Sequence, residues 1–471
     1  MAKSNKRDLS KKTLIYSFGT VASVLAALFA APIITNYISP EDFGNYEFTI
    51  SIMFLVSTFG FLDIPNAMLR FMYGIEKEDS EFQKSTIYSS LLIQFICTLG
   101  LFVSVPIINQ FMNIPFPKSG LIFGICYSTS LFYLNVARGQ DKEINYTVGF
   151  SLYHSFYLIS IFILVLLLKF PSPAILWSMS IGYSIQIIYL ERNTKLLSNF
   201  KINYIKINVL KKILRFALPL AIASFGNWIL QHYTNIKLLN SMGSYENGIY
   251  ALALNVSRTI PTLSFGLIMA WQEIAYSNKE RDDEKNQYFA RVIINIIVIL
   301  ILIYMLFVPT ATLVVPYYLG DAYNGLLSIL FLTTASLSID MLSLMLASII
   351  GNSVNSKPIM VSIGIGAIVY LLTIDQLIDY YGLIGAGVAN LIGFLTTAIV
   401  RLIWIRLAMK IKLPLIRMFL LALVAGIFGY LSYKFEVKGN IILLFVAAIP
   451  SIPYFYTFKK KQKQYKQSKD Y

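Results

Sequence analysis

The chain alternates long apolar runs with short breaks that hold charged and turn-forming residues. Several runs carry no charge over about the 20 residues that a helix needs to cross roughly 30 Å of hydrocarbon. Since a bilayer offers no water to backbone groups, such runs are expected to be helical, which predicts an all-α polytopic membrane protein. The pattern predicts about fourteen transmembrane helices, near residues 13–37, 44–69, 86–111, 119–137, 146–168, 172–190, 216–239, 248–273, 290–317, 324–350, 358–375, 382–405, 415–433 and 440–458.

The composition supports the same conclusion. Of the 471 residues, 56% are hydrophobic and 13% are charged, whereas soluble domains carry roughly a quarter charged residues. Cys97 and Cys126 both lie inside apolar runs, so we interpret them as packing residues and not as a disulfide or metal pair. The sequence holds no zinc-protease, serine-hydrolase or phosphate-binding loop motif. We therefore expect a protein that is not an enzyme and uses no cofactor.

The basic residues predict the orientation in the membrane. With the N-terminus in the cytoplasm, 33 of the 39 Lys and Arg residues belong to the N-terminus, the even-numbered breaks or the tail, and four lie in odd-numbered breaks. Lys237 and Arg258 fall within spans. The positive-inside rule then places both termini inside. Because the net charge of +15 is spread over many short edges, nucleic-acid binding is not expected.

An internal repeat divides the chain. The segments 39–46 and 243–250 both lie between an odd-numbered and an even-numbered span, and their Gly-x-Tyr elements are 204 residues apart. Two halves of six helices enter the membrane in the same sense, and such parallel repeats enclose a central substrate site that serves alternating access. The predicted parts are an N-terminal lobe at 1–200, a C-terminal lobe at 208–410, two additional helices at 411–458 and a basic cytoplasmic tail at 459–471.

Three segments resemble a known family. The Ser-Pro-Glu-Asp-Phe-Gly-Asn-Tyr stretch at 39–46 is similar to the first outer loop of bacterial polysaccharide-transport proteins, the O-antigen and capsule repeat-unit flippases. Residues 218–220 with 248–253, and residues 381–389, resemble the same proteins. The resemblance covers nearly the whole chain and implies the multidrug/oligosaccharidyl-lipid/polysaccharide exporter superfamily. One departure is residues 233–235, Tyr-Thr-Asn, where many relatives carry an Asp-Arg pair.

The resemblance also implies a function. Such a flippase moves undecaprenyl-pyrophosphate-linked oligosaccharide repeat units from the inner to the outer leaflet of the bacterial plasma membrane. The implied partners are this lipid-linked oligosaccharide, membrane lipids, and the polysaccharide polymerase with other assembly proteins. A lipid II flippase and a multidrug or cation antiporter of the same superfamily remain alternatives. The membrane potential, which contributes about 2.3 kcal/mol per charge per 100 mV, and a cation gradient both remain candidate energy sources.

Arg258 is the first candidate site residue. It lies ten residues into a span that begins outside near Gly248, so a rise of about 1.5 Å per residue places it roughly 15 Å deep. A guanidinium at that depth costs about 2.5–3.5 kcal/mol unless it faces protein, water or an anion. Two interpretations remain open. Arg258 binds the pyrophosphate of a sugar-linked lipid, or it forms an ion pair with Asp340.

Four further charged residues are weaker candidates for substrate binding. Lys237 could line the same cavity, or it could extend to lipid headgroups, as long basic side chains near an interface do. Arg70 and Arg138 end spans on the cytoplasmic side, where they could capture a pyrophosphate or follow the usual basic bias. Asp63, two residues before Pro65, has two possible roles. It lines the cavity, where it binds sugar hydroxyls, a cation or a proton, or it is a hydrogen-bonding partner between helices.

The uncharged polar candidates lie on two spans. Asn227, Gln231 and Asn235 recur every four residues, so they share one helix face, which must turn away from lipid. With Asn255 on the next span they suit a carbohydrate path, and the alternative role is hydrogen bonding between helices, at about 0.6 kcal/mol per bond.

Overall fold

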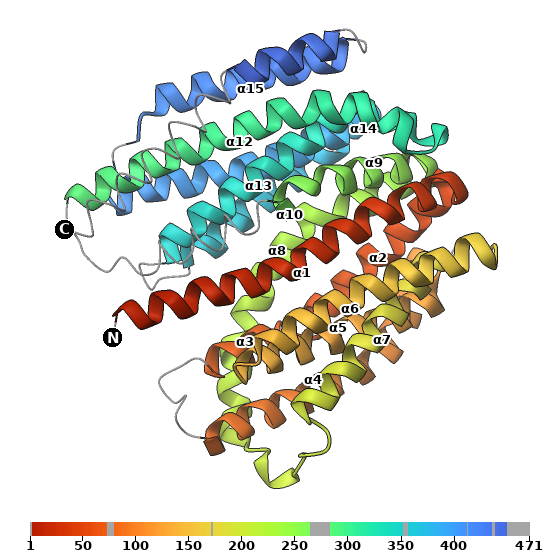
Figure 1. The fold of residues 1–471 in the computed structure, drawn as a ribbon, viewed down its shortest axis with the longest axis vertical. Helices are drawn as coiled ribbons and strands as arrows, with labels where there is room; N and C mark the ends of the chain where they lie inside the picture. The colour runs from red at the N-terminus through yellow and green to blue at the C-terminus, as the bar shows by residue number, and fades with distance from the viewer. Residues whose placement is uncertain are drawn as a thin grey trace.

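The computed structural model is a bundle of long helices (Figure 1). The structure describes residues 2–72, 80–170, 173–263, 283–351, 357–411, 413–435 and 439–449, and no strand occurs in these residues. Helices are the expected outcome, because each apolar run can satisfy its backbone hydrogen bonds only within itself when lipid surrounds it.

The N-terminal half consists of one short 3₁₀ segment and a series of α-helices, the sixth of which continues into a single π-helical stretch. In chain order these elements are α1 (Ala2–Tyr37), α2 (Pro40–Gly60), α3 (Ile64–Met72), α4 (Ser80–Met112), α5 (Pro117–Gly139), α6 (Glu143–Ile161) with π-helical η2 (Phe162–Leu167), α7 (Ala174–Thr194) and 3₁₀ helix η3 (Ile202–Tyr204).

The C-terminal half repeats this arrangement with longer helices. Its elements are α8 (Ile207–Ser241), α9 (Ser244–Ser257), α10 (Thr259–Leu263), α12 (Asp283–Tyr318), 3₁₀ helix η4 (Asp321–Ser328), α13 (Leu330–Gly351), α14 (Lys357–Ala408), α15 (Leu415–Lys434) and a short apolar helix at Gly439–Ile449.

Every predicted span overlaps at least one described helix. Eight of the described helices are long and apolar enough to cross a membrane by length and composition. The 52-residue α14 covers two predicted spans, because Gly382 leaves the helical conformation at φ 56° and separates its two parts. This backbone conformation favours glycine, which has no Cβ to clash. The ends of two predicted spans, residues 264–273 and 450–458, and the basic tail lie outside the described residues.

The second predicted span is interrupted. The sequence predicts one helix over 44–69, whereas the structure ends α2 at Gly60 and begins α3 at Ile64. Leu62 and Asp63 adopt left-handed backbone conformations, with φ of 49° and 54°. Such conformations cost roughly 1–2 kcal/mol for residues other than glycine, and the turn directs the Asp63 side chain into the bundle interior described below.

The helices form two groups that meet along α2 (Figure 1). In the first group α6 packs against α1 and α7, and α5 packs against α7; in the second, α13 and α8 pack against α14, and α15 packs against α12. Contacts between the groups run mainly from α2 to α8 and α9, with further contacts from α3 and α4 to α8. The predicted organisation as two bundles with additional C-terminal helices therefore agrees with the packing.

The repeated Gly-x-Tyr elements face each other at one end of this interface. We call this end, which carries the α1–α2 and α8–α9 turns, the outer end, following the predicted orientation. A Cβ atom on Gly44 would overlap the carbonyl oxygen of Ser244, and one on Gly248 would overlap that of Pro40. Asn247 also donates a hydrogen bond to the Gly44 carbonyl oxygen at 2.8 Å. The two groups are thus closed against each other at the outer end through backbone contact.

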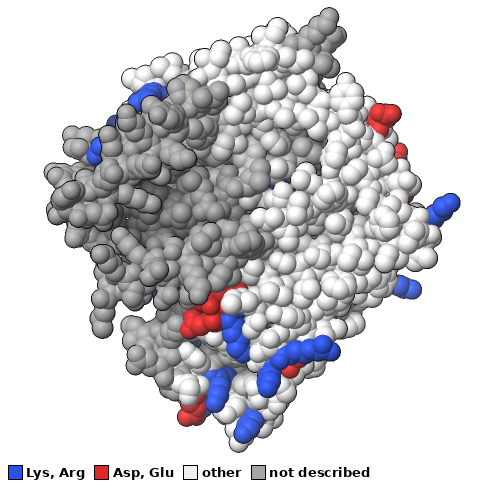
Figure 2. Space-filling model, viewed as in Figure 1, with Lys and Arg blue, Asp and Glu red and all other residues white. Residues whose placement is uncertain are grey.

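The surface is that of a protein in lipid. On the face shown in Figure 2, the charged side chains of the described residues lie mostly toward the margins, and the described surface drawn in white beside them is broad and uncharged. Large apolar side chains are exposed along the helices, including Phe95, Phe102 and Val103 of α4 at 54–62% exposure. Exposed apolar area on this scale is expected where hydrocarbon is the solvent.

Candidate functional site

A cavity of about 480 Å³ lies between the two groups of helices. Residues from the α2–α3 turn, α5 and α8 line it, and Arg258 contributes from the end of α9. Its walls combine aromatic rings, amide and hydroxyl groups, one carboxylate and one guanidinium. We call this space the central cavity, since it lies where the two halves meet.

Arg258 is the positive charge of the central cavity. It is half-buried directly after the last residue of α9, and its NH1 donates a hydrogen bond to Asn255 Oδ1 at 2.6 Å. Among the described residues no ion pair joins Arg258 to Asp340, whose electrostatic partner is Arg401. The acidic residue that interacts electrostatically with Arg258 is Glu47 of α2.

Glu47 is the residue that the sequence interpretation missed. Its side chain is 4% exposed, and Asn255 Nδ2 donates a hydrogen bond to Glu47 Oε1 at 2.9 Å. The Asn255 amide therefore joins the carboxylate of one half to the guanidinium of the other. A signal was present in the sequence, because Glu47 is an ionisable residue inside the predicted span 44–69, and such residues are functional candidates.

Asp63 supplies a carboxylate on the other side of the central cavity. It accepts hydrogen bonds from Asn66 Nδ2 at 2.6 Å and from Ser224 Oγ of α8 at 3.3 Å. Both oxygens are therefore partnered, one within the turn and one across the interface between the halves. Asp63 therefore lines the cavity and also bonds between helices, and its role in binding sugar hydroxyls, a cation or a proton stays a prediction.

The polar face of α8 divides between the cavity and the interface. Asn227 and Gln231 line the central cavity, as a carbohydrate path requires. Asn235 does not line it; its side chain is 1% exposed and donates to Ser51 Oγ of α2 at 3.1 Å. Trp228 Nε1 also donates to the Ser51 carbonyl oxygen at 2.9 Å. One helical turn therefore separates a lining residue from one that ties α8 to α2.

Aromatic rings form part of the cavity wall. Phe54 packs at 5.0 Å against both Tyr127 and His232, measured between ring centroids, and all three line the central cavity. Trp228 lines it as well and stacks on Phe225 at 5.9 Å. Large planar apolar faces beside amide and carboxylate groups suit a sugar ring, which presents C–H faces and hydroxyl edges.

The remaining basic candidates lie outside the central cavity. Lys237 forms an ion pair with Asp375 Oδ1 at 2.8 Å near the outer end, where the two side chains are 27% and 60% exposed. Arg70 is exposed in the last turn of α3, and Arg138 lies 5.8 Å from the ring of Tyr146 at the end of α5. None of the three lines the cavity, so the structure does not bring them together with Arg258.

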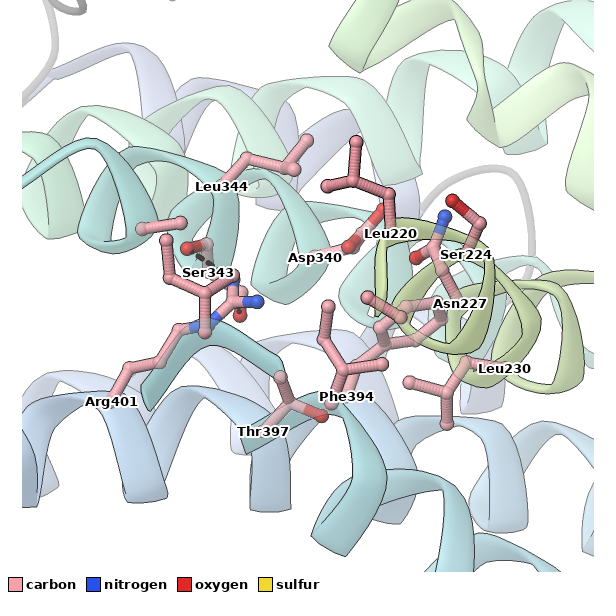
Figure 3. Close-up of a pocket in the computed structure, with 14 residues that line it drawn as sticks. Leu220, Ser224, Asn227, Leu230, Asp340, Ser343, Leu344, Phe394, Thr397 and Arg401 are labelled. Atoms are coloured by element: carbon pink, nitrogen blue, oxygen red, sulfur yellow. Dashed lines mark hydrogen bonds between the residues drawn. The ribbon is translucent and has the colours of Figure 1, made fainter. Parts of the chain in front are cut away.

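A second cavity of about 230 Å³ lies within the C-terminal group, between α8, α13 and α14 (Figure 3). Asp340 and Arg401 line it, as do Ser224 and Asn227 from α8. Asp340 therefore belongs to this space, where its electrostatic partner is Arg401. In the part of the chain that the structure describes, no group of three His, Cys, Asp or Glu side chains is arranged to hold a metal ion.

Arg401 is a second residue that the sequence interpretation misplaced. The charge count left only Lys237 and Arg258 within spans, yet Arg401 is 3% exposed inside α14. Its Nε donates to Ser362 Oγ at 2.9 Å, and its NH1 donates to the carbonyl oxygen and Oγ of Ser343 at 2.6 and 2.7 Å. This buried guanidinium is part of the internal packing of the C-terminal group and not of the cytoplasmic edge.

A comparison with protein-family models identifies the family of this chain. A family model described as Polysaccharide biosynthesis protein matches residues 9–272, which is more than half of the chain. The chain belongs to this family. A sequence search of curated proteins finds no match.

Solved structures of transporters share the fold of this family member. An inward-facing multidrug resistance MATE family transporter of the MOP superfamily is 15% identical, with a TM-score of 0.64 over 82% of this chain and 94% of that chain. The lipid II flippase MurJ in an inward closed conformation is 16% identical, with a TM-score of 0.63 over 95% and 99%. A MOP superfamily transporter from Pyrococcus furiosus is 15% identical, with a TM-score of 0.59 over 85% and 95%.

These matches confirm the resemblance found in the sequence. The family match supports the polysaccharide part of that resemblance, and the proteins that share the fold are described as MOP superfamily transporters and a lipid II flippase. They agree with the predicted all-α architecture of about fourteen helices in two bundles.

Proposed function

We propose that this polysaccharide biosynthesis family member flips an undecaprenyl-pyrophosphate-linked oligosaccharide from the inner to the outer leaflet of the bacterial plasma membrane. The observation that carries this proposal is the central cavity, which combines Arg258 with sugar-compatible aromatic and amide groups between two bundles that can rock. Arg258 binds the pyrophosphate, the oligosaccharide occupies the cavity, and the polyprenyl tail remains in lipid.

The residues that line the cavity have different roles in binding the oligosaccharide. Asn227 and Gln231 donate hydrogen bonds to sugar hydroxyls and accept them, Asp63 accepts them, and the rings of Tyr127 and Trp228 provide stacking faces. A negative cell interior favours outward movement of the anion by about 2.3 kcal/mol per charge per 100 mV, so the membrane potential favours export, and a cation gradient is the other candidate energy source. The polysaccharide polymerase on the outer side then consumes the delivered unit.

The domain boundaries and the orientation belong to the same proposal. We propose that residues 1–200 and 208–410 move as two lobes, that 411–458 add two helices, and that 459–471 follow the inner-leaflet headgroups. The outer backbone contact at Gly44 and Gly248 closes the cavity on the extracytoplasmic side in this state.

A depletion and rescue experiment in the native host tests the function. We expect depletion to abolish surface polysaccharide and to accumulate the complete lipid-linked unit on the inner leaflet. Wild type and the control Lys118→Gln, which removes an exposed charge at the start of α5, should restore polymer. Arg258→Gln should fail, because a hydrogen bond to a charged group contributes about 1.5–3 kcal/mol, or roughly 10- to 150-fold in binding.

Two other outcomes would change the assignment. Normal polymer and normal lipid intermediates after depletion would remove the flippase proposal and favour drug efflux. Arrest of cell-wall growth with accumulation of lipid II would favour the second candidate, a lipid II flippase, for which the structural similarity to MurJ over 95% of this chain is the supporting observation. Equal rescue by Arg258→Gln would keep the function and assign Arg258 a structural role.

A further inference from the structure

The polar connection between α2 and α9 contains one carboxylate and one guanidinium. Arg258 NH1 donates to Asn255 Oδ1 at 2.6 Å, and Asn255 Nδ2 donates to Glu47 Oε1 at 2.9 Å. A single amide thus uses its acceptor for the guanidinium and its donor for the carboxylate. Since Glu47 belongs to α2 and the other two residues to α9 and its end, this chain of hydrogen bonds crosses between the halves.

A structural role alone does not require the charge on Glu47. A glutamine at position 47 would present the same oxygen to Asn255 without the cost of burying a carboxylate, which amounts to several kcal/mol for an ion taken out of water. Among the described residues, Asn255 is the hydrogen-bond donor to the Glu47 side chain, and Arg258 is the positive charge that acts on it. The carboxylate therefore has an electrostatic function directed at Arg258.

We propose that Glu47 is the resident counter-ion of Arg258, held there by Asn255, and that an anionic cargo displaces it and so releases α2 from α9. This inference rests on the proposed function, because it requires an anion at Arg258. When a pyrophosphate takes the guanidinium, Asn255 Oδ1 loses its donor and Glu47 faces a second negative charge. The hydrogen-bonded connection then becomes unfavourable, and the halves separate at the outer end.

The thermodynamics follow from linkage. A ligand shifts a conformational equilibrium only by its difference in affinity between the two states. The closed-outside state places Glu47 against the anion site, whereas separation of α2 from α9 removes that negative charge. An anion therefore binds the separated state more tightly. Bound cargo thus shifts the protein toward the state in which the cavity opens at the outer end.

Binding to the purified full-length protein in phosphatidylcholine nanodiscs tests this mechanism. The probe is farnesyl pyrophosphate, and farnesol, which has the same tail and no charge, is the matched ligand control. We expect Glu47→Gln to bind farnesyl pyrophosphate about tenfold more tightly than wild type, since one negative charge near the site is removed. Farnesol binding should not change. The control Glu41→Gln, an exposed carboxylate in the first turn of α2, should behave as wild type.

A distance measurement across the outer end tests the conformational step. Spin labels at the exposed positions Lys118 and Asn240, in a background lacking Cys97 and Cys126, report separation of the two halves. Farnesyl pyrophosphate, but not farnesol, should lengthen this distance in wild type. In Glu47→Gln, which keeps the acceptor for Asn255 but has no charge for the anion to repel, farnesyl pyrophosphate should leave the distance unchanged. Asn255→Leu removes the bridging amide and keeps both charges, so the longer distance should be present without ligand; this variant tests the connection if Glu47→Gln does not fold.

The outcomes separate this inference from the proposed function. Wild type that binds farnesyl pyrophosphate no better than farnesol would overturn the anionic cargo and the counter-ion together. Wild type that prefers farnesyl pyrophosphate, with Glu47→Gln binding it equally or more weakly, would leave the function standing and overturn the role of Glu47. An unchanged label distance on addition of farnesyl pyrophosphate to wild type would overturn the release of α2 from α9.

Discussion

Substituting Gly44 or Gly248 by alanine tests whether backbone contact closes the outer end. Each added Cβ would overlap a carbonyl oxygen of the opposite half, that of Ser244 or of Pro40. Backbone atoms cannot rotate away as a side chain can, so the helices must move apart. Inserting one methyl group into a packed contact costs about 1–3 kcal/mol.

Helix propensity does not offset this cost. Alanine is favoured over glycine within a helix by about 0.5–1 kcal/mol, but both glycines lie inside helices that persist when the outer ends separate, so this gain stabilises both states equally. The expected cost to the closed-outside state is therefore the steric one of about 1–3 kcal/mol, or a roughly 5- to 150-fold shift toward separated outer ends. Gly100→Ala is the matched control, because Gly100 lies inside α4 with no atom within 4 Å of an added Cβ.

The label pair at Lys118 and Asn240 provides the assay. Gly44→Ala and Gly248→Ala should each increase the population with the longer distance, and the two should agree, since the contacts are reciprocal. Gly100→Ala should leave the distance distribution unchanged while raising the melting temperature slightly. If both interface variants match Gly100→Ala in distance and in stability, backbone contact at these glycines does not hold the outer end closed.

Two further variants separate buried from exposed charges. Arg401→Leu should destabilise the protein by about 3–5 kcal/mol, because it leaves Asp340 without the positive charge that acts on it. Size-exclusion chromatography with thermal melting should show loss of folded protein for this variant. The control Arg406→Leu, an exposed position on the same helix, should remain folded. Lys237→Gln breaks the ion pair with Asp375, which is largely exposed, so stability should change by less than about 1 kcal/mol and surface polymer should remain normal. A loss of polymer with Lys237→Gln would return this residue to the transport path.

The sequence by itself determined the architecture. Charge-free runs long enough to cross hydrocarbon must be helical in a bilayer, so the helical class and the order of the spans could be predicted from spacing alone, whereas the break between Gly60 and Ile64 could not. The repeat of Gly44-x-Tyr46 in Gly248-x-Tyr250 indicated two equivalent halves, and the structure places these two glycines against each other. Arg258 could also be identified, because a guanidinium near the middle of a span must face something other than lipid.

Only the tertiary structure decided which neighbour each polar side chain meets. Depth in the membrane follows from residue number, so Asp340 was a reasonable partner for Arg258. The rotation of each helix about its axis is not given by depth, and it directs Asp340 toward Arg401 and leaves Glu47 beside Arg258. The Glu47–Asn255 contact joins residues 208 positions apart. Helical periodicity predicts that polar residues share a face; the packing of the two halves determines whether that face meets a cavity, as at Gln231, or a neighbouring helix, as at Asn235.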